Sequence, residues 1–390
     1  MNKRKTLLVL GNGFDLAHDL HTRYTDFLEY IQKNVNEIRS AEKTRKTAEF
    51  IMQLRDDTKK QSEAMFYDEI VNSAKVRDLE KNIKEVADSL NNGSDNTGIF
   101  SQLCELCWRY LYLNGNYWLN YFDKINNKYN WVDFEQEVQQ VVSALEQFIV
   151  NGNISDDEYR WLCAVLGKKK INRNDIVKNI IPKLLFDLQI LTYLLEEYLI
   201  KETENAEQNK KLESICTNVD GVITYNYTDV FEKLYFVPNE KIYHVHGELG
   251  KHNLVLGIGE TLQDNDVNRY TYFSSFKKYF QKIIYGLGNS YKGVLGYKEN
   301  EPCPNEYFRY LRNRSGDWNV IIYGHSLDVT DSDSLGWIMT HPLVKSITIY
   351  YIDTKSLNSI IANMTIILGK NLLLKKVDEQ VIHFKRVNNM

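Results

Sequence analysis

The chain has 390 residues, enough to bury a sizeable core and to form two domains. Its 43% hydrophobic and 26% charged residues are ordinary for a globular protein, and its net charge of −4 lacks the basic excess typical of nucleic-acid-binding domains. No apolar stretch approaches the ~20 residues of a membrane-spanning helix, and the one after Lys3-Arg4-Lys5 is too short for a signal peptide. We therefore expect a cytoplasmic protein that binds no membrane.

The first predicted element is a buried strand over residues 5–10, followed by the turn Gly11-Asn12-Gly13 and the start of a helix. Gly11 and Gly13 allow backbone N–H groups to approach a phosphate, and a helix N-terminus attracts negative charge. A full dinucleotide fingerprint would need glycine at position 16, which is leucine, so an ordinary dehydrogenase is disfavoured. Tight packing of the turn explains the two glycines equally well.

Residues 25–201 show apolar side chains at three- and four-residue spacing almost throughout, which predicts helices, and residues 202–214 read as a polar connector. In this helical part, Cys104 and Cys107 have the spacing of a zinc or redox pair. No second pair accompanies them, so we interpret them as buried helix residues. The five cysteines are odd in number and scattered, which argues against a disulfide framework.

The segment Trp131-Val132-Asp133-Phe134-Glu135 is best explained as the start of a helix, with Trp131 packing at its end and Asp133 near the helix dipole. The alternative is that Asp133 closes a site from the helical part.

Short apolar strands then alternate with helices, at residues 221–225, 241–246, 253–256, 320–323 and 346–352. This alternation predicts an α/β fold with a mostly parallel sheet covered by helices on both faces, which the strand of residues 5–10 would join. We expect the sheet domain to comprise residues 1–24 and 215–390, interrupted by a large all-helical insertion of residues 25–214.

Glycine or functional polar residues follow the ends of these strands. In open parallel sheets, ligands bind beyond the carboxyl ends of the strands, so the set predicts a nucleotide site. Its expected nucleotide-binding members are Gly11, Asn12, Gly13, Asp15, Asp229, Gly324, Ser326 and Asp353, and its expected catalytic members are Asn226 and His246.

His246 ends a strand before Gly247 and is well placed to act as a general base. His244 lies on the same face of the strand and is expected to have a structural role. A metal pair would need further ligands, and no Cys, Asp or Glu with ligand spacing accompanies them, so we expect no metal. The alternative for His246 is a buried hydrogen-bonding histidine.

Two other strand-end residues also have structural alternatives. Asn226 is free to hold a ribose hydroxyl or a water if Thr228 or Asp229 caps the next helix; otherwise it is itself the cap. Asp353 has the acceptors for two ribose hydroxyls, or it caps the helix that begins near Thr354.

These motifs resemble the bacteriophage abortive-infection AbiH family, itself related to sirtuin-like NAD-binding domains. The matching pieces come in sirtuin order, from a Gly-x-Gly loop to a Gly-x-Ser segment. They are Gly11-Asn12-Gly13-Phe14-Asp15-Leu16-Ala17-His18, Ile223-Thr224-Tyr225-Asn226-Tyr227-Thr228-Asp229, His244-Val245-His246-Gly247-Glu248-Leu249 and Tyr323-Gly324-His325-Ser326-Leu327.

The resemblance implies an antiphage defence protein with a sirtuin-like, Rossmann-type sheet that cleaves NAD to nicotinamide and ADP-ribose. By this resemblance, Gly11 to Gly13 and Ser326 hold the pyrophosphate and ribose, and Asp353 holds the adenosine ribose. Asn226 positions the nicotinamide ribose or the attacking water, and His246 is the base. NAD is then a substrate, and a phage-derived protein and a second copy of the chain are the other partners considered.

The chain departs from deacetylase sirtuins because it has one Cys-x-x-Cys pair rather than the two of their zinc module, which disfavours deacylation. Two other functions remain open at this stage. One is a nucleotide-binding sensor of a phage component that has no catalytic activity. The other is a metal-dependent nuclease or phosphoesterase that uses Asp15, Asp229 and His246, which the acidic charge balance disfavours.

Overall fold

The computed structural model describes residues 4–53, 61–91, 96–125, 131–152, 154–259, 271–296, 303–314 and 316–387. The chain forms two compact units. Unit 1 contains Met1–Arg23, Trp131–Asn153 and Leu199–Met390, and unit 2 contains Tyr24–Asn130 and Ile154–Tyr198.

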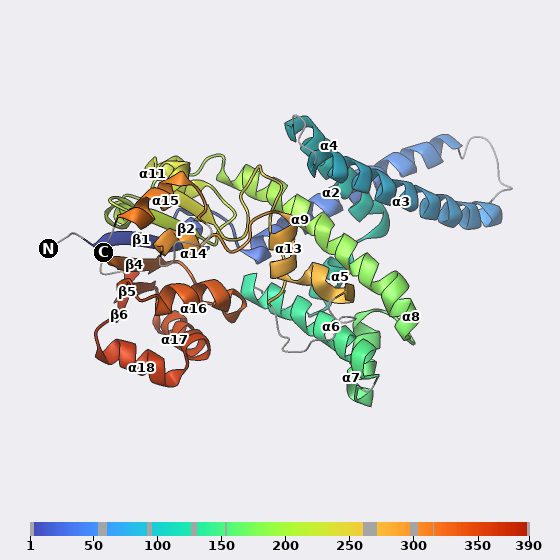
Figure 1. The fold of residues 1–390 in the computed structure, drawn as a ribbon. Coiled ribbons are helices and arrows are strands. Elements are labelled where there is room, and N and C mark those ends of the chain that lie inside the picture. The colour runs from blue at the N-terminus through green and yellow to red at the C-terminus, as the bar shows by residue number, and fades with distance from the viewer. Residues whose placement is uncertain are drawn as a thin grey trace. The chain divides into compact units, whose positions relative to one another are not determined.

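A six-stranded sheet lies at the centre of unit 1 (Figure 1). In spatial order its strands are β3 (Ile242–His244), β2 (Gly221–Thr224), β1 (Lys5–Leu10), β4 (Trp318–Tyr323), β5 (Val344–Tyr351) and β6 (Ile382–Arg386). All neighbouring strands pair in parallel. This order is that of doubly wound nucleotide-binding folds, which confirms the predicted α/β class.

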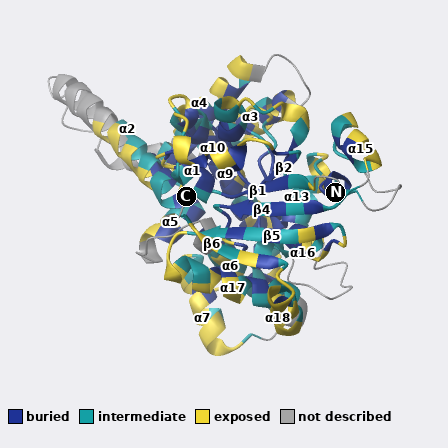
Figure 2. Cartoon of the chain, turned by 90° about the vertical axis from the view of Figure 1, so that its left-hand side faces the viewer, coloured by how far each residue is buried: buried dark blue, intermediate teal, exposed yellow. Residues whose placement is uncertain are grey.

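The sequence of β1 explains its central place. Leu7, Leu8, Val9 and Leu10 are all at most 1% exposed, so both faces of the strand are covered. Because side chains alternate along a strand, Leu7 and Val9 contribute to one apolar cluster and Leu8 and Leu10 to another. Figure 2 shows the same pattern, with a buried sheet between more exposed helices.

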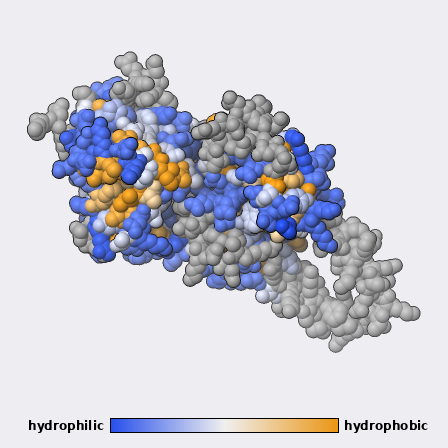
Figure 3. Space-filling view, turned by 90° about the horizontal axis from the view of Figure 1, so that it is seen from below, coloured by the Kyte–Doolittle hydropathy of each residue, from blue (hydrophilic) through white to orange (hydrophobic). Residues whose placement is uncertain are grey.

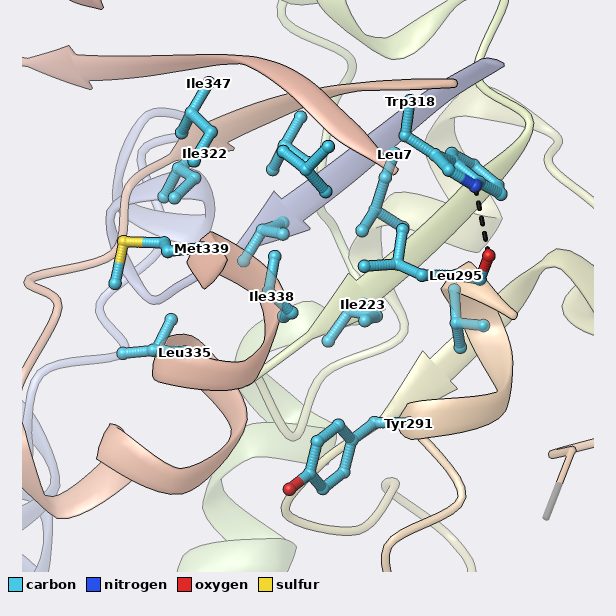
Figure 4. Close-up of a cluster of buried hydrophobic side chains, with 14 of the residues drawn as sticks. Leu7, Ile223, Tyr291, Leu295, Trp318, Ile322, Leu335, Ile338, Met339 and Ile347 are labelled. Carbon is cyan, nitrogen blue, oxygen red and sulfur yellow. Dashed lines mark hydrogen bonds between the residues drawn. The ribbon is translucent and has the colours of Figure 1, made fainter. Parts of the chain in front are cut away.

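The cluster around Leu7 packs the sheet against α16 (Ser332–Thr340) (Figure 4). Leu335, Ile338 and Met339 of α16 are fully buried there. At the start of β4 the indole Nε1 of Trp318 donates to Leu295 O at 3.2 Å, so this large buried side chain has its polar atom satisfied.

The remaining helices of unit 1 are mostly short. They are α1 (Gly13–Leu16), α6 (Trp131–Asn151), α10 (Glu213–Cys216), α11 (Val230–Tyr235), α13 (Lys278–Ile284), α14 (Lys292–Leu295), α15 (Glu306–Asn313), α17 (Thr354–Leu368) and α18 (Lys370–Asp378). Single 3₁₀ turns occur at Lys210–Leu212, Asn239–Lys241, Ser274–Phe276 and Val329–Asp331.

Unit 2 is helical, as the periodicity predicts. Its elements are α2 (Tyr24–Gln53), α3 (Gln61–Asn91), α4 (Asn96–Asn114), α5 (Tyr117–Ile125), α7 (Asp156–Val165), α8 (Arg173–Asp175), a π-helical turn at Ile176–Ile180, and α9 (Ile181–Thr203), which continues into unit 1. Cys104 and Cys107 are buried in α4, in agreement with their interpretation as buried helix residues.

The two units divide the chain differently from the expected domain boundaries. Residues 131–153 and 199–214 belong with the sheet, although the sequence analysis assigned them to the helical insertion. α6 contacts this unit through two buried ion pairs, between Glu135 and Lys278 and between Glu146 and Lys277. Helical periodicity identifies a helix but does not tell which unit it packs against.

One predicted strand is wrong. Residues 253–256 form no strand, although Leu254, Val255 and Leu256 are at most 2% exposed. The segment crosses the end of β3, where the Val255 N–H donates to His246 O at 2.8 Å. A short apolar run therefore marked burial correctly but not its backbone conformation. The edge strand β6 was not predicted, because it exposes His383 and Lys385.

Among the described residues, no single helix is long and apolar enough to cross a membrane; α17 and α18 pass that test of length and composition only as a pair, bent by 113°. Exposed apolar side chains gather on the surface of these two helices (Figure 3), where Ile366 is 70% and Leu374 is 53% exposed.

Candidate functional site

Four neighbouring strands end in register at the carboxyl edge of the sheet. Leu10 of β1 pairs with Thr224 of β2 and Tyr323 of β4, and Thr224 pairs with His244 of β3. Adjacent strands lie about 4.8 Å apart, so residues that follow these positions are neighbours. Two residues beyond the paired positions the chain carries, across the edge, His246, Asn226, Asn12 and His325.

Asp15 is the centre of a buried hydrogen-bonded group. It is 1% exposed, and its two carboxylate oxygens accept from Asn226 Nδ2 at 3.0 Å and from Thr228 Oγ1 at 2.7 Å. Burial raises the pKa of Asp15 to about 7, although the hydrogen bonds from Thr228 and Asn226 oppose the rise. The carboxyl group therefore changes protonation near neutral pH.

The amide of Asn226 is held in one orientation by this group. Its Nδ2 donates to Asp15, so its Oδ1 points elsewhere and is an acceptor. That Oδ1 is buried and has no hydrogen-bond partner among the residues the structure describes. Asn226 does not cap the next helix: the N-cap of α11 is Asp229, whose side chain makes no capping hydrogen bond.

His244 supports the main chain beneath Asn226. Its Nε2 lies 2.6 Å from Glu232 Oε1 and its Nδ1 lies 3.3 Å from the carbonyl oxygen of Asn226. Burial alone would lower the pKa of His244, but Glu232 outweighs it and raises the pKa above its ordinary value. His244 therefore has a structural role, and it is the last residue of β3, two residues before His246.

His246 is held through its ring nitrogen Nε2. Its Nε2 lies 2.9 Å from Asp331 Oδ1, at the end of the 3₁₀ turn Val329–Asp331. Burial lowers the pKa of His246 to about 3, although Asp331 opposes this, so the ring is neutral at physiological pH. Its Nδ1 is buried and, like Asn226 Oδ1, has no partner in the described part of the chain.

Asp331 belongs to a buried ionic group. Lys278 Nζ lies 3.3 Å from Asp331 Oδ1 and 2.9 Å from Glu135 Oε2, and Glu135 accepts from Thr330 Oγ1 at 3.2 Å. Burial favours the neutral carboxyl, but Lys278 and the contacts with His246 and His325 together outweigh it and keep the pKa of Asp331 well below its usual range. Asp331 is therefore an ionised carboxylate paired with the ammonium group of Lys278.

Glu135, Lys278 and Asp331 were not among the site residues expected from the sequence. The sequence carries a signal for Glu135, since it ends the segment Trp131-Val132-Asp133-Phe134-Glu135, in which Asp133 was the candidate site residue. The side chains of Trp131 and Asp133 lie outside the described residues. No strand-end pattern points to Lys278 or Asp331, because both lie in helical turns.

The two glycine turns interlock. A Cβ on Gly11 would come within 2.6 Å of His325 Cα, and one on Gly13 within 2.6 Å of Gly324 Cα. Gly324 has φ +71 and its own Cβ would overlap Phe14 N. The N–H groups of Gly11 and Gly13 donate to Tyr323 O and Gly324 O. Close packing of two loops therefore accounts for these glycines, and their N–H groups are engaged within the protein.

The other expected nucleotide-binding residues lie around this centre. Asn12 exchanges hydrogen bonds with Thr22, and Asp229 pairs with Lys233 at 2.9 Å. Ser326 is exposed. Asp353 is the N-cap of α17 and accepts from Ser356 N at 2.7 Å, which is the capping alternative considered above. The structure thus places Asp15, Asn226 and His246 at one edge of the sheet. Among the described residues, no hydrogen bond or ion pair joins Ser326 or Asp353 to these three.

No group of three or more His, Cys, Asp or Glu side chains in the described part of the chain has the arrangement of a metal site. His244 pairs with Glu232 and His246 with Asp331, so the two histidines have separate partners.

A family model described as bacteriophage abortive infection AbiH matches residues 7–353, which include most of β1, all of β2 to β5 and every strand end discussed above. No curated protein and no solved structure matches the chain.

Proposed function

The chain belongs to the bacteriophage abortive infection AbiH family and so acts in antiphage defence, and we propose that it does so as an NAD glycohydrolase. The reaction would consume water and release nicotinamide, ADP-ribose and a proton. Loss of NAD would arrest the growth of the infected cell.

One observation carries this proposal. Asn226 Oδ1 and His246 Nδ1 are both buried and both without a partner among the described residues, and they lie at the ends of neighbouring strands. An unsatisfied buried polar atom costs about 1–3 kcal/mol, so folded proteins rarely leave two together without a ligand to satisfy them. Two acceptors fit a ligand that donates hydrogen bonds, such as a ribose or a bound water.

The fold supports a dinucleotide. The strand order reverses between β1 and β4, and in such sheets a nucleotide binds beyond the carboxyl ends near the reversal. We propose that Gly11 to Gly13, Asp15, Asp229 and Gly324 shape this region for NAD, and that the exposed hydroxyl of Ser326 contacts the pyrophosphate or ribose. Asp353 would use the oxygen that does not cap α17.

The proposed reaction forms no covalent bond between the protein and NAD. The bond between nicotinamide and C1′ of the ribose breaks with its electron pair going to the cationic ring, and water then attacks C1′ and loses a proton. Asn226 Oδ1 would accept a hydrogen bond from that water or from a ribose hydroxyl, and His246 Nδ1 would accept the proton. Neutral His246 has a lone pair on Nδ1 for this step, and the ionised Asp331 beside Nε2 would stabilise the imidazolium that forms.

Nicotinamide release tests the proposal. We expect release from NAD by the purified protein or by lysates of phage-infected cells that express it, and a loss of at least about 100-fold in Asn226→Ala and His246→Ala. Asn358→Ala and His383→Ala are matched controls, since both residues are exposed, on α17 and β6, and both should retain activity.

Three outcomes would contradict the proposal. Full activity in both site variants would remove their catalytic roles. Binding of NAD or ADP-ribose without product, even in infected cells, would favour a sensor without catalysis. Chelator-sensitive cleavage of DNA or RNA would favour the phosphoesterase alternative.

A further inference from the structure

We propose that Asp331 fixes His246 in one tautomer, with the proton on Nε2, so that Nδ1 is the nitrogen that accepts a hydrogen bond from a hydroxyl group of the substrate. This inference rests on the proposed function for the identity of the substrate, but its geometric part stands on the contacts of Asp331 alone.

The first step is the contact between the two side chains. An ionised carboxylate can only accept hydrogen bonds, so at 2.9 Å the Nε2 of a neutral His246 must carry the proton and donate it to Asp331 Oδ1. A neutral imidazole has one protonated nitrogen, and Nδ1 is then an acceptor. The tautomer therefore follows from the charge of Asp331.

The second step is what keeps Asp331 charged. Lys278 Nζ lies 3.3 Å from the oxygen that meets His246, and a lysine ammonium group has donors only. Lys278 is itself held by Glu135 of α6 at 2.9 Å. His325 adds a weaker electrostatic contact. Its Nδ1 accepts from Leu327 N, so its Nε2 carries a proton, and this nitrogen lies 3.8 Å from Asp331 Oδ2, beyond hydrogen-bond distance.

The third step concerns the side chains that surround the ring of His246. Tyr225 and Tyr227 flank the ring of His246, with ring centroids 5.5 and 6.4 Å away. The hydroxyl groups of these tyrosines are engaged, with Ser334 and with Val255 O respectively. The donor that would satisfy Nδ1 is therefore absent from these neighbours, and a hydroxyl of the ligand fits that need.

The arrangement gives Asp331 a positioning role. It touches His246 and not the reacting atoms, and Lys278 and Glu135 act one contact further away. The use of a carboxylate behind a histidine to select one tautomer is a general device of acid–base catalysis.

Asp331→Leu tests the inference because it removes the acceptor that Nε2 meets. Lys278 Nζ and His246 Nε2 both meet Oδ1, so an asparagine would keep its amide oxygen toward both donors and leave the tautomer as it is. Without the acceptor, His246 is no longer held with its proton on Nε2 and samples both tautomers. The ¹⁵N chemical shifts of histidine distinguish protonated from unprotonated ring nitrogens, and His246→Gln identifies its signals among the eight histidines.

We expect the wild-type protein at neutral pH to show a protonated Nε2 and an unprotonated Nδ1 at His246, and the ¹⁵N shifts of the two nitrogens to move toward each other in Asp331→Leu. Asp333→Leu is the matched control, since Asp333 is exposed in the same helical segment and its change should leave the tautomer as in wild type. A protonated Nδ1 in the wild type, or unchanged shifts in Asp331→Leu, would overturn the inference. Should Asp331→Leu not fold, the wild-type spectrum still decides.

Activity gives a second readout. Nicotinamide release should fall on the order of 10²-fold or more in Asp331→Leu, in kcat rather than KM, because Nδ1 is no longer held as the acceptor. Full activity in Asp331→Leu with both tautomers present would overturn the positioning role of Asp331. If the wild type releases no nicotinamide, the proposed function fails, and the spectra alone still decide the tautomer.

Discussion

Replacing Asp15 by asparagine tests whether the buried carboxyl that orients Asn226 lowers the free energy of unfolding when it is ionised. Asp15 is 1% exposed, and it accepts hydrogen bonds from Asn226 Nδ2 and Thr228 Oγ1. Asparagine has nearly the same shape but no charge, so Asp15→Asn removes the burial of an ionised group and leaves the packing in place.

The magnitude follows from the pKa. In the unfolded chain Asp15 titrates near 3.8, and in the folded protein burial raises its pKa to about 7. Between these values the folded state holds a proton that the unfolded state has released, so stability falls as the pH rises through this window. At about 1.4 kcal/mol for each pH unit, the carboxylate costs roughly 4 kcal/mol above pH 7 relative to acid pH.

Urea unfolding of the wild type and of Asp15→Asn between pH 4.5 and 8 measures this cost. The free energy of unfolding of the wild type, relative to that of the variant, should fall by a few kcal/mol over the range. Asp19→Asn is the control, because Asp19 is exposed four residues further on and its change should add no such slope. A difference between wild type and Asp15→Asn that stays constant with pH would refute the reasoning.

Two further predictions concern the packing around the site. Lys277→Met should cost about 3–5 kcal/mol, because it leaves Glu146 buried without its ammonium partner at 3.1 Å, and Lys277→Met with Glu146→Leu should recover much of that loss in thermal unfolding. Gly324→Ala should cost about 2–5 kcal/mol through the overlap with Phe14 N and the positive φ, whereas Gly250→Ala, with a similar φ of +75 and open space, should cost about 1–2 kcal/mol. Equal losses in the two glycine variants would show that loop packing does not matter at Gly324.

Much of the fold could be predicted from local patterns. The run Leu7-Leu8-Val9-Leu10 is apolar at every position, and only a strand buried on both faces needs that. Asn226 and His246 could be found because polar residues directly after buried strands have to lie at one edge of a parallel sheet. This logic needs only the order of residues along each strand.

The rest depends on contacts between distant segments. Glu135 lies about 140 residues before Lys278 in the sequence and reaches it only because α6 packs on the sheet unit. Asp331 lies in a 3₁₀ turn, where no periodicity marks a residue that will face a histidine. The strand predicted at residues 253–256 failed for a related reason, because an apolar run reports burial and not conformation.

The glycine turn shows how one pattern can have two causes. In the sequence, Gly11-Asn12-Gly13 after a buried strand suggests a phosphate site, and the structure gives the glycines a packing reason, since Gly11 and Gly13 meet the loop of Gly324. The two causes are compatible in space. By locking the ends of β1 and β4 together, the glycines also fix the start of α1, which carries Asp15. Asp15 in turn orients Asn226, so the rigid turn would serve the site through the amide it positions rather than through its own N–H groups.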